Sequence, residues 1–381
     1  MEEKTSSSKW LGWLVLAIVV IGGGWWLMGH GSASKVAETG PIKIGFIGPL
    51  TGDAAVIGEP IQNGIKLAVT EINQNGGING RQIEAIYEDG KCTGKDAVSA
   101  AQKLITVDQV KYIVGGVCSS EAFGFAPITS AAKVVVIMPG ASAPKLSGVS
   151  PFVVRNNPND NAPGIALADY LAKSYKNVAI LSEQTDYAQG MKAVFVGEMQ
   201  KNGLSVSSED YNGDATDFRA VLSKVKAVNP DALFINAQTP ANLLRVASQA
   251  RQLGISAQFV SAAFNDPAVV GAGATTNGMV LADAPGLASA GNGPALIDAY
   301  KTAYGKEPTY AFYVGAAYDG IHLIAQAITS AGDDTTKVAS YLHSLPSYTG
   351  TIGTYSFDQN GDIVGITSIL QKIENGKLTN L

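Results

Sequence analysis

Hydrophobic positions along this chain follow one repeating order for most of its length. A short apolar run, typical of a buried parallel strand, is followed by a small or polar loop and then by apolar residues at helical spacing. The first cycle predicts a strand at residues 42–47 and a helix at residues 59–73, which the glycines of residues 75–80 end. The repeated order predicts an α/β fold with parallel central sheets and right-handed crossovers.

The same pattern predicts the remaining elements. We expect further strands at residues 82–87, 112–114, 134–138, 178–181, 205–209, 232–235, 258–261, 279–283, 351–357 and 366–373. We expect further helices at residues 96–105, 121–132, 162–173, 190–202, 217–228, 241–253, 294–304 and 313–331. A dense run of Asn, Asp and Pro at residues 151–161 interrupts the alternation, so we predict that the chain crosses there into a second lobe. Residues 284–285 mark the crossing back.

The predicted organisation is therefore two Rossmann-like lobes behind an N-terminal extension. The predicted segments are a tail (1–9), an apolar segment (10–29), a linker (30–41), lobe 1 (42–159 and 285–362) and lobe 2 (160–284 and 363–381). Two such lobes leave a cleft walled by loops at strand ends. Clefts of this kind commonly bind small molecules and close by hinge motion.

The apolar N-terminal segment predicts attachment to a membrane. Residues 10–28 carry no charge and are long enough to cross a bilayer as a helix, with tryptophans at both ends. A cleaved signal peptide is the alternative, with residues 31–33 as its cleavage site. We favour an uncleaved helix that tethers the rest of the chain at the extracytoplasmic face of the cell membrane.

Composition excludes some functions and suggests an oxidising compartment. Charged residues make up 15% of the chain and the net charge is −5, whereas a nucleic-acid partner requires a basic patch. The two cysteines, Cys92 and Cys118, suggest a disulfide in an exported chain, and two buried free thiols are the alternative. No metal-ligand spacing, P-loop or dinucleotide fingerprint is present, so we predict neither a metal nor a cofactor.

The strongest candidate site consists of two strand-end loops, residues 115–120 and 139–142. In a parallel sheet both loops fall at the carboxyl ends of neighbouring strands, where ligands bind. Their small residues let a ligand approach the backbone, and the helix start near residue 121 offers unpaired N–H groups to an anion. Ser119 and Ser142 add hydroxyl groups, although Ser119 is also a preferred residue type for capping that helix.

An enzymatic alternative rests on the same loop. Residues 116–120 lie between a strand and a helix, as a nucleophile elbow does, with Cys118 as an amidase nucleophile. However, Ser120 stands where the elbow has a glycine, and His322, one of two candidate bases, falls inside a predicted helix. We therefore predict that the chain is not an enzyme, and we assign Asp319 in that helix a structural role.

Several motifs together resemble the branched-chain amino acid (leucine/isoleucine/valine) binding proteins of ABC importers. They are residues 44–52, 63–64, 71–73, 76–80, 87–89 with Cys92, 116–120, 139–144 and 310–319. The resemblance covers nearly everything from residue 42 onward. It implies a type I periplasmic-binding fold, in which two lobes joined by three hinge crossings clamp an amino acid. It also implies a monomer that delivers its small-molecule ligand to an ABC permease in the membrane.

The resemblance implies roles for individual residues. Ser119 matches a serine that binds the ligand carboxylate, and the family's disulfide maps onto Cys92 and Cys118. The further ligand contacts that we expect are Gly140, Ala141, Ser142, Tyr187, Gln238 and Thr239. Phe264, which follows the strand predicted at residues 258–261, is an additional candidate.

Two departures leave the ligand open. Leucine-selective members carry an acidic residue after the strand that matches residues 258–261, and it pairs with the ligand ammonium; here no carboxylate occurs until Asp266. Ile57 stands where the family has an aromatic residue. An unpaired buried ammonium is costly, so Asp186 is a candidate replacement, or the ligand is an amide, a small organic acid or another amino acid. A membrane-tethered sensor with the same fold is the alternative function.

Overall fold

The computed structural model describes residues 40–262, 266–287 and 291–381. The chain divides into two compact units, residues 1–40 and 41–381, and the fold described below is that of the second. The predicted tail and apolar segment, and the linker up to residue 39, lie outside the described residues. Within the described part, no helix is both long and apolar enough to cross a membrane.

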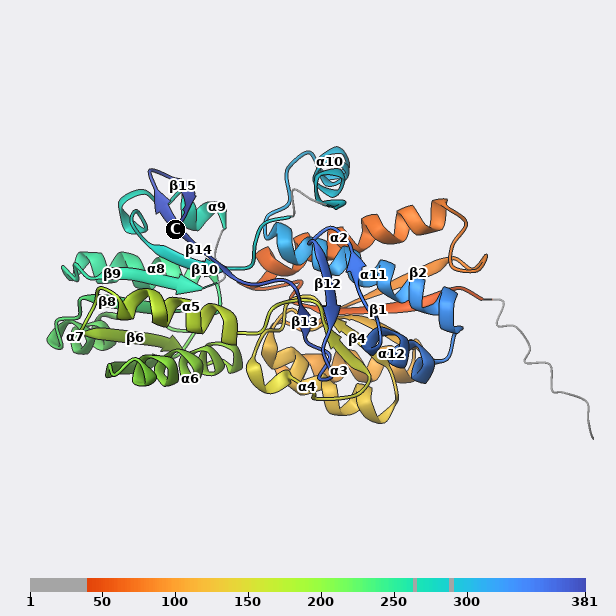
Figure 1. The fold of residues 1–381 in the computed structure, drawn as a ribbon, viewed down its shortest axis with the longest axis horizontal. Coiled ribbons are helices and arrows are strands. Elements are labelled where there is room, and N and C mark those ends of the chain that lie inside the picture. Colours follow the sequence, from red (N-terminus) through yellow and green to blue (C-terminus); the bar gives the residue numbers. More distant parts are fainter. Residues whose placement is uncertain (1–39, 263–265, 288–290) are drawn as a thin grey trace, which may run out of the picture. The chain divides into compact units, whose positions relative to one another are not determined.

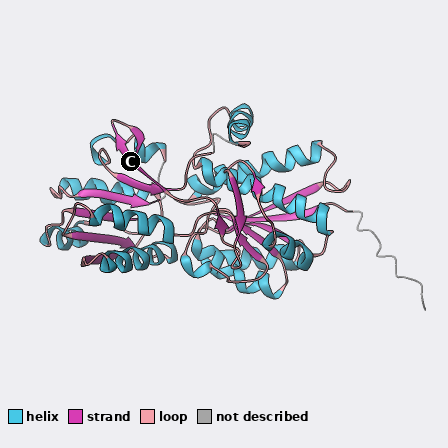
Figure 2. Cartoon of the chain, viewed as in Figure 1, coloured by secondary structure: helices cyan, strands magenta, loops and turns pink. Residues whose placement is uncertain are grey.

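The first sheet has five parallel strands in the order β2-β1-β3-β4-β5. They are β1 (Ile42–Gly48), β2 (Ile83–Asp89), β3 (Tyr112–Gly115), β4 (Val135–Met138) and β5 (Val153–Arg155). The helices associated with it are α2 (Ala55–Gln74), α3 (Gly94–Thr106), α4 (Ser119–Ala131), α10 (Gly293–Tyr304), α11 (Ala311–Ala331) and α12 (Thr335–His343), with the short η1 (Pro144–Leu146). Figure 1 labels most of these elements, and Figure 2 shows strands and helices in separate colours.

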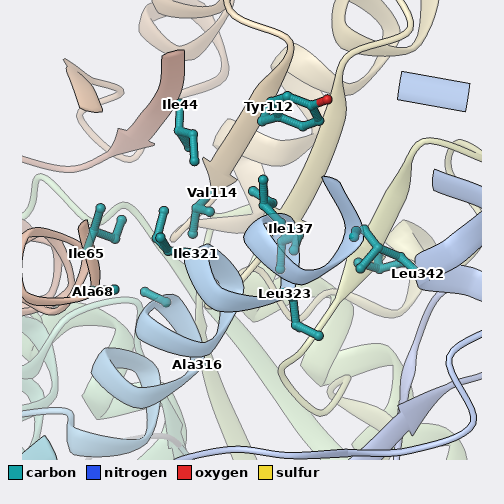
Figure 3. Close-up of a cluster of buried hydrophobic side chains, with 14 of the residues drawn as sticks. Ile44, Ile65, Ala68, Tyr112, Val114, Ile137, Ala316, Ile321, Leu323 and Leu342 are labelled. Carbon is teal, nitrogen blue, oxygen red and sulfur yellow. The ribbon is translucent and has the colours of Figure 1, made fainter. Parts of the chain in front are cut away.

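Helices cover both faces of this sheet, which explains why its strands are continuous apolar runs. Ile44 of β1 and Val114 of β3 belong to a buried cluster with residues of α2 and α11, such as Ile65 and Ile321 (Figure 3). Alternate strand residues, including Ile113, belong to a second cluster with residues of α3 and α4. The strand register therefore divides each apolar run between two cores.

The second sheet has seven strands in the order β15-β14-β10-β9-β8-β6-β7. They are β6 (Val178–Glu183), β7 (Val206–Tyr211), β8 (Ala232–Asn236), β9 (Gln258–Ala262), β10 (Val280–Asp283), β14 (Ile369–Glu374) and β15 (Lys377–Asn380). The helices that accompany it are α5 (Asn161–Ala172), α6 (Asp186–Lys201), α7 (Arg219–Ala227), α8 (Pro240–Gln252) and α9 (Pro267–Val270), with the short η2 (Gly273–Thr275). Strands β6 to β10 run parallel, whereas β14 and β15 form an antiparallel edge.

A small antiparallel sheet joins β11 (Tyr348–Thr349), β12 (Thr354–Phe357) and β13 (Ile363–Val364). It is attached to α11 through Asp319, whose carboxylate accepts the N–H of Thr351 at 2.9 Å and the hydroxyls of Thr351 at 2.9 Å and Tyr355 at 3.3 Å. This buried network is the structural role that the sequence predicted for Asp319.

The predicted fold class is confirmed, and the differences are local. The run at residues 151–161 contains β5, which is only three residues long and therefore gives little periodicity to detect. Helix α12 was not predicted; Asp334 caps it by accepting the N–H groups of Thr336 at 3.0 Å and Lys337 at 3.1 Å. The antiparallel edge of the second sheet also went unpredicted, because strand direction is set by connections and not by apolar pattern.

We expect the substitution Asp319→Ala to lower the free energy of unfolding by about 3 kcal/mol, since it leaves several buried donors without an acceptor. Urea unfolding of the purified protein measures this change. Asp298→Ala, at an exposed position on α10, is the control and should change stability by less than about 0.5 kcal/mol. Equal effects of the two substitutions would contradict the structural role of Asp319.

Candidate functional site

A cavity lies at the carboxyl ends of β3 and β4. The residues that line it lie on loops and helices next to both sheets, including the start of α11. They are Ile57, Val117, Cys118, Ser119, Gly140, Ser142, Tyr187, Gln238, Tyr310 and Tyr313.

The two strand-end loops of the first sheet pack directly against each other. The N–H of Ala141 donates to the carbonyl of Gly116 at 2.8 Å. A Cβ atom at Gly140 would lie 2.7 Å from the carbonyl oxygen of Val117, so no larger residue fits without moving that loop. The small residues noted in the sequence are therefore required by the close approach of the loops, and the same approach brings Ser119 beside Ser142.

Ser119 connects these loops through its hydroxyl group. It is the first residue of α4, and its Oγ accepts the N–H groups of Ser142 at 3.3 Å and Ala143 at 3.1 Å. The N-cap residue of α4 is Cys118, so the interpretation of Ser119 as a helix cap is wrong. Because Oγ accepts two bonds, its hydrogen remains available as a donor to the cavity.

The disulfide between Cys92 and Cys118 is present, with the Cα atoms 5.2 Å apart. It excludes both the free thiols and the nucleophilic cysteine that the sequence left open. The carboxylate of Glu121 links the same two segments of the chain a second time. It accepts the N–H groups of Cys92 at 3.0 Å, Val117 at 3.1 Å and Cys118 at 3.0 Å. Burial raises the pKa of Glu121 to about 7, and these three hydrogen bonds oppose the shift.

The second sheet contributes two predicted residues to the cavity. Tyr187 lies in the first turn of α6, where only 6% of its surface is exposed. Burial and the nearby carboxylates of Asp160 and Asp283 hold the pKa of Tyr187 well above its usual value, so its phenol stays protonated. Gln238 precedes α8, and its backbone N–H donates to Oε2 of Glu183 at 2.8 Å.

Three candidates among the described residues do not line this cavity. Ala141 is fully buried, with its N–H bonded to Gly116 as described above. Thr239 caps α8 by accepting the N–H of Asn242 at 3.2 Å, which occupies its hydroxyl oxygen. Asp186 is exposed and lines a different hollow, so its position does not suit a partner for a buried ammonium. Phe264 lies outside the described residues.

Sequence reasoning assigned no role to Tyr310 and Tyr313, although both lie in a motif that carried the resemblance. Both line the cavity. Tyr310 has a positive φ of 54°, a conformation that costs roughly 1–3 kcal/mol in a residue with a side chain. Such strain at the wall of a cavity is consistent with a residue held in place for binding.

A second, adjoining cavity was not predicted at all. It shares Ser142, Tyr187 and Tyr313 with the first and adds two acidic residues, Asp160 and Asp283. Asp160 follows β5, and Asp283 is the last residue of β10; they are 2% and 3% exposed. The described residues contain no cluster of three or more His, Cys, Asp and Glu side chains suited to a metal ion.

Comparison with known proteins gives one consistent family. The family described as periplasmic binding protein matches residues 41–377. The leucine-, isoleucine-, valine-, threonine- and alanine-binding protein of Pseudomonas aeruginosa is 32% identical over 88% of this chain and 90% of its own length.

Two solved structures extend this comparison. The branched-chain amino acid transporter substrate binding protein of Streptococcus pneumoniae, solved with isoleucine, has a TM-score of 0.79 and 28% identity over 89% of this chain and 97% of its own. A solute binding protein of an ABC transporter from Rhodopseudomonas palustris, solved with 3,4-dihydroxy benzoic acid, has a TM-score of 0.77 and 25% identity over 90% of this chain and 96% of its own.

The buried Asp160 makes stability depend on pH. Burial raises the pKa of Asp160 to about 7, against smaller lowering effects of Ser142 and Arg155. Because the folded pKa exceeds the unfolded one, the stability linked to this group is complete below about pH 4 and is lost as the pH rises through about 7. We expect Asp160→Asn to be more stable than the natural protein by about 3 kcal/mol at pH 8, and by less at pH 5.

Urea unfolding at the two pH values measures this difference. Asp298→Asn, at an exposed site, is the control and should leave the pH dependence unchanged. An Asp160→Asn protein that is less stable than the natural one at pH 8 would show that the carboxylate is compensated in the folded state.

Proposed function

We propose that this chain, which belongs to the family of periplasmic binding proteins, captures a small carboxylate in its cavity and delivers it to the permease of an ABC importer. Members of the family are solute-binding proteins, and the chain is accordingly not an enzyme. The single observation that carries the proposal is the geometry of Ser119, a buried hydroxyl that faces the cavity with its hydrogen unused.

The chemistry around Ser119 suits an anion. Its hydroxyl can donate to a carboxylate oxygen, and a hydrogen bond to a charged group is stronger than one between neutral groups. Ser119 is also the first residue of α4, where backbone N–H groups lack partners within the helix and the helix dipole favours negative charge. The serine hydroxyl and the helix terminus therefore act together on one group of the ligand.

The relatives support a carboxylate as the shared feature of the ligand. The names of two relatives specify amino acids, and that of a third specifies a dihydroxybenzoic acid. These ligands differ in their amino group and ring, but each has a carboxylate. The apolar and aromatic walls formed by Ile57, Val117, Tyr310 and Tyr313 supply the remaining contact surface.

We propose closure of two lobes as the binding mechanism. Lobe 1 comprises residues 42–159 and 285–362 and holds the carboxylate first, while lobe 2, residues 160–284 and 363–381, brings Tyr187 and Gln238 over the ligand. The cavity is lined from both, and Arg245 of α8 reaches Asp53 of the β1–α2 loop at 3.4 Å. This exposed pair contributes little energy but marks where the lobes meet when closed.

Delivery to a permease requires the ligand-binding part to lie outside the cytoplasm. The family is periplasmic, which supports this location for the present chain. We propose that residues 10–29 anchor it as a monomer to the membrane in which the permease resides.

Calorimetric titration of the purified protein tests the proposal. The panel is leucine, isoleucine, valine, threonine, alanine, 3,4-dihydroxybenzoate and leucinamide, which has no carboxylate. We expect at least one carboxylate to bind and leucinamide to give no heat. Binding of leucinamide as tightly as any acid, or of no compound at all, would reject the proposed ligand class.

We expect Ser119→Ala to weaken binding of the preferred acid by about 1–3 kcal/mol, because it removes a hydrogen bond to a charged group. The matched control is Ser120→Ala, which changes the next residue of the same helix but does not line this cavity. Calorimetry on both variants separates the two positions. Equal losses in both would assign the effect to the helix start and remove Ser119 from the site.

A further inference from the structure

We propose that Asp160 and Asp283 form the cation-binding end of the ligand site, so that the ligand is a zwitterion whose ammonium group enters the second cavity. This inference rests on the proposed function, because it takes the carboxylate of the same ligand to be bound at Ser119. It specifies the substrate as an amino acid and not as an aromatic or aliphatic acid without an amino group.

Asp160 occupies the N-cap position of α5 but makes no capping hydrogen bond. An aspartate at that position ordinarily accepts an N–H from the first turn, a contact worth about 1 kcal/mol. Instead the side chain lines the second cavity, and among the described residues its buried Oδ2 has no hydrogen-bond partner. A buried carboxylate oxygen without a donor is costly, so the site is incomplete without a ligand group that donates to it.

Arg155, the cation whose charge acts on Asp160, does not fill this role. The guanidinium of Arg155 donates to Oδ1 of Asp362 at 3.0 and 2.6 Å, to the carbonyl of Ala143 at 3.0 Å and to the hydroxyl of Ser147 at 3.1 Å. It therefore acts on Asp160 only through its field, which lowers the pKa of that carboxyl. An additional cation within the cavity would find an acceptor that Arg155 leaves open.

Asp283 places a second carboxylate at the same cavity from the opposite sheet. Its Oδ1 accepts the N–H of Ala284 at 2.7 Å, which fixes the side chain at the end of β10. The pKa of Tyr313 lies well above its usual value. Burial is the largest cause, and the electrostatic effects of Asp283, Tyr187 and Asp160 add to it. Two tyrosines and two aspartates thus line one cavity, which is an environment suited to an ammonium ion.

The hydroxyl groups divide the site into two ends. Ser119 accepts two backbone N–H groups and is left to donate, which suits a carboxylate. Ser142 lies beside Asp160, where hydrogen bonding lowers the pKa of that carboxyl, and the carboxylates at this end can only accept when ionised. Since Ser142 lines both cavities, a ligand that bridges them meets a donor at one end and acceptors at the other.

This arrangement accounts for the missing acidic residue. The strand β9 ends at Ala262, which also lines the second cavity, and no carboxylate occurs in the sequence between it and Asp266. Asp266 accepts the N–H of Ala268 at 2.7 Å and lines neither cavity. Asp160 and Asp283, which do not belong to β9 or the loop after it, supply the missing negative charge.

Calorimetry of the full-length protein with matched ligands tests the inference. The probes are leucine, isocaproate (leucine without its amino group) and 3,4-dihydroxybenzoate. We expect leucine to bind at least about tenfold more tightly than isocaproate. Isocaproate or dihydroxybenzoate binding as tightly as leucine would overturn the inference and leave the proposed function intact. No binding of any of the three, nor of the other acids in the panel described above, would overturn both.

Two variants locate the effect. We expect Asp160→Asn and Asp283→Asn each to weaken leucine binding about tenfold or more but not to weaken isocaproate binding, and binding of isocaproate also shows that the variants are folded. Asp186→Asn is the matched control, an exposed aspartate that lines neither cavity, and should bind leucine as the natural protein does. Natural leucine affinity in both cavity variants would overturn the inference, and if either fails to fold, the comparison of leucine with isocaproate still decides it.

The pH dependence of leucine binding gives an independent readout. The groups around Asp160 are Asp283, Arg155, Ser142, Tyr187 and Tyr313. The raised pKa values of Tyr187 and Tyr313 keep both phenols uncharged between about pH 5.5 and pH 7.5. An ammonium favours the ionised Asp160, so we expect leucine affinity to rise across this interval and the rise to disappear in Asp160→Asn. Leucine affinity that is independent of pH would contradict the role of Asp160.

Discussion

The contact between the loops after β3 and β4 is the constraint on which the rest of the site depends. It requires small residues on both sides, because a Cβ atom at Gly140 would collide with the Val117 carbonyl. The Ser119 hydroxyl, bonded to the N–H groups of Ser142 and Ala143, holds the loops together. The Cys92–Cys118 disulfide and the Glu121 carboxylate hold the base of the first loop. One packing requirement thus fixes the donor at one end of the cavity and brings Ser142 toward the other.

The buried carboxylates of the core and of the cavity differ in how completely they are hydrogen-bonded. The core carboxylate Asp319 has several donors, whereas Asp160 gives up the capping bond that its position in α5 offers and keeps one oxygen without a partner. An uncompensated buried carboxylate lowers stability, and natural proteins retain such groups where function requires them. Asp319 therefore has a structural role, whereas the missing partner of Asp160 is the observation behind the ligand-binding role that we propose for it.

Much of the fold could be predicted from apolar periodicity, because helices cover both faces of the first sheet and leave its strands as uninterrupted apolar runs. The pattern did not reveal β5, which is three residues long, or the antiparallel direction of β14. In the site, the small residues before Ser119 and Ser142 gave a local signal. Asp160 and Asp283 gave none, since they lie far apart in the sequence beside prolines and meet only through the tertiary fold. Thr239, by contrast, was predicted from the sequence as a ligand contact but serves as a helix cap.

A crystal structure of the protein with its bound ligand would show directly whether one molecule contacts both Ser119 and Asp160. We expect a small molecule that spans both cavities, with its carboxylate at hydrogen-bond distance, about 2.5–3.2 Å, from Ser119 Oγ and its ammonium at similar distance from Asp160. A ligand bound in the reverse orientation, or one that leaves Asp160 and Asp283 without a cationic partner, would contradict it.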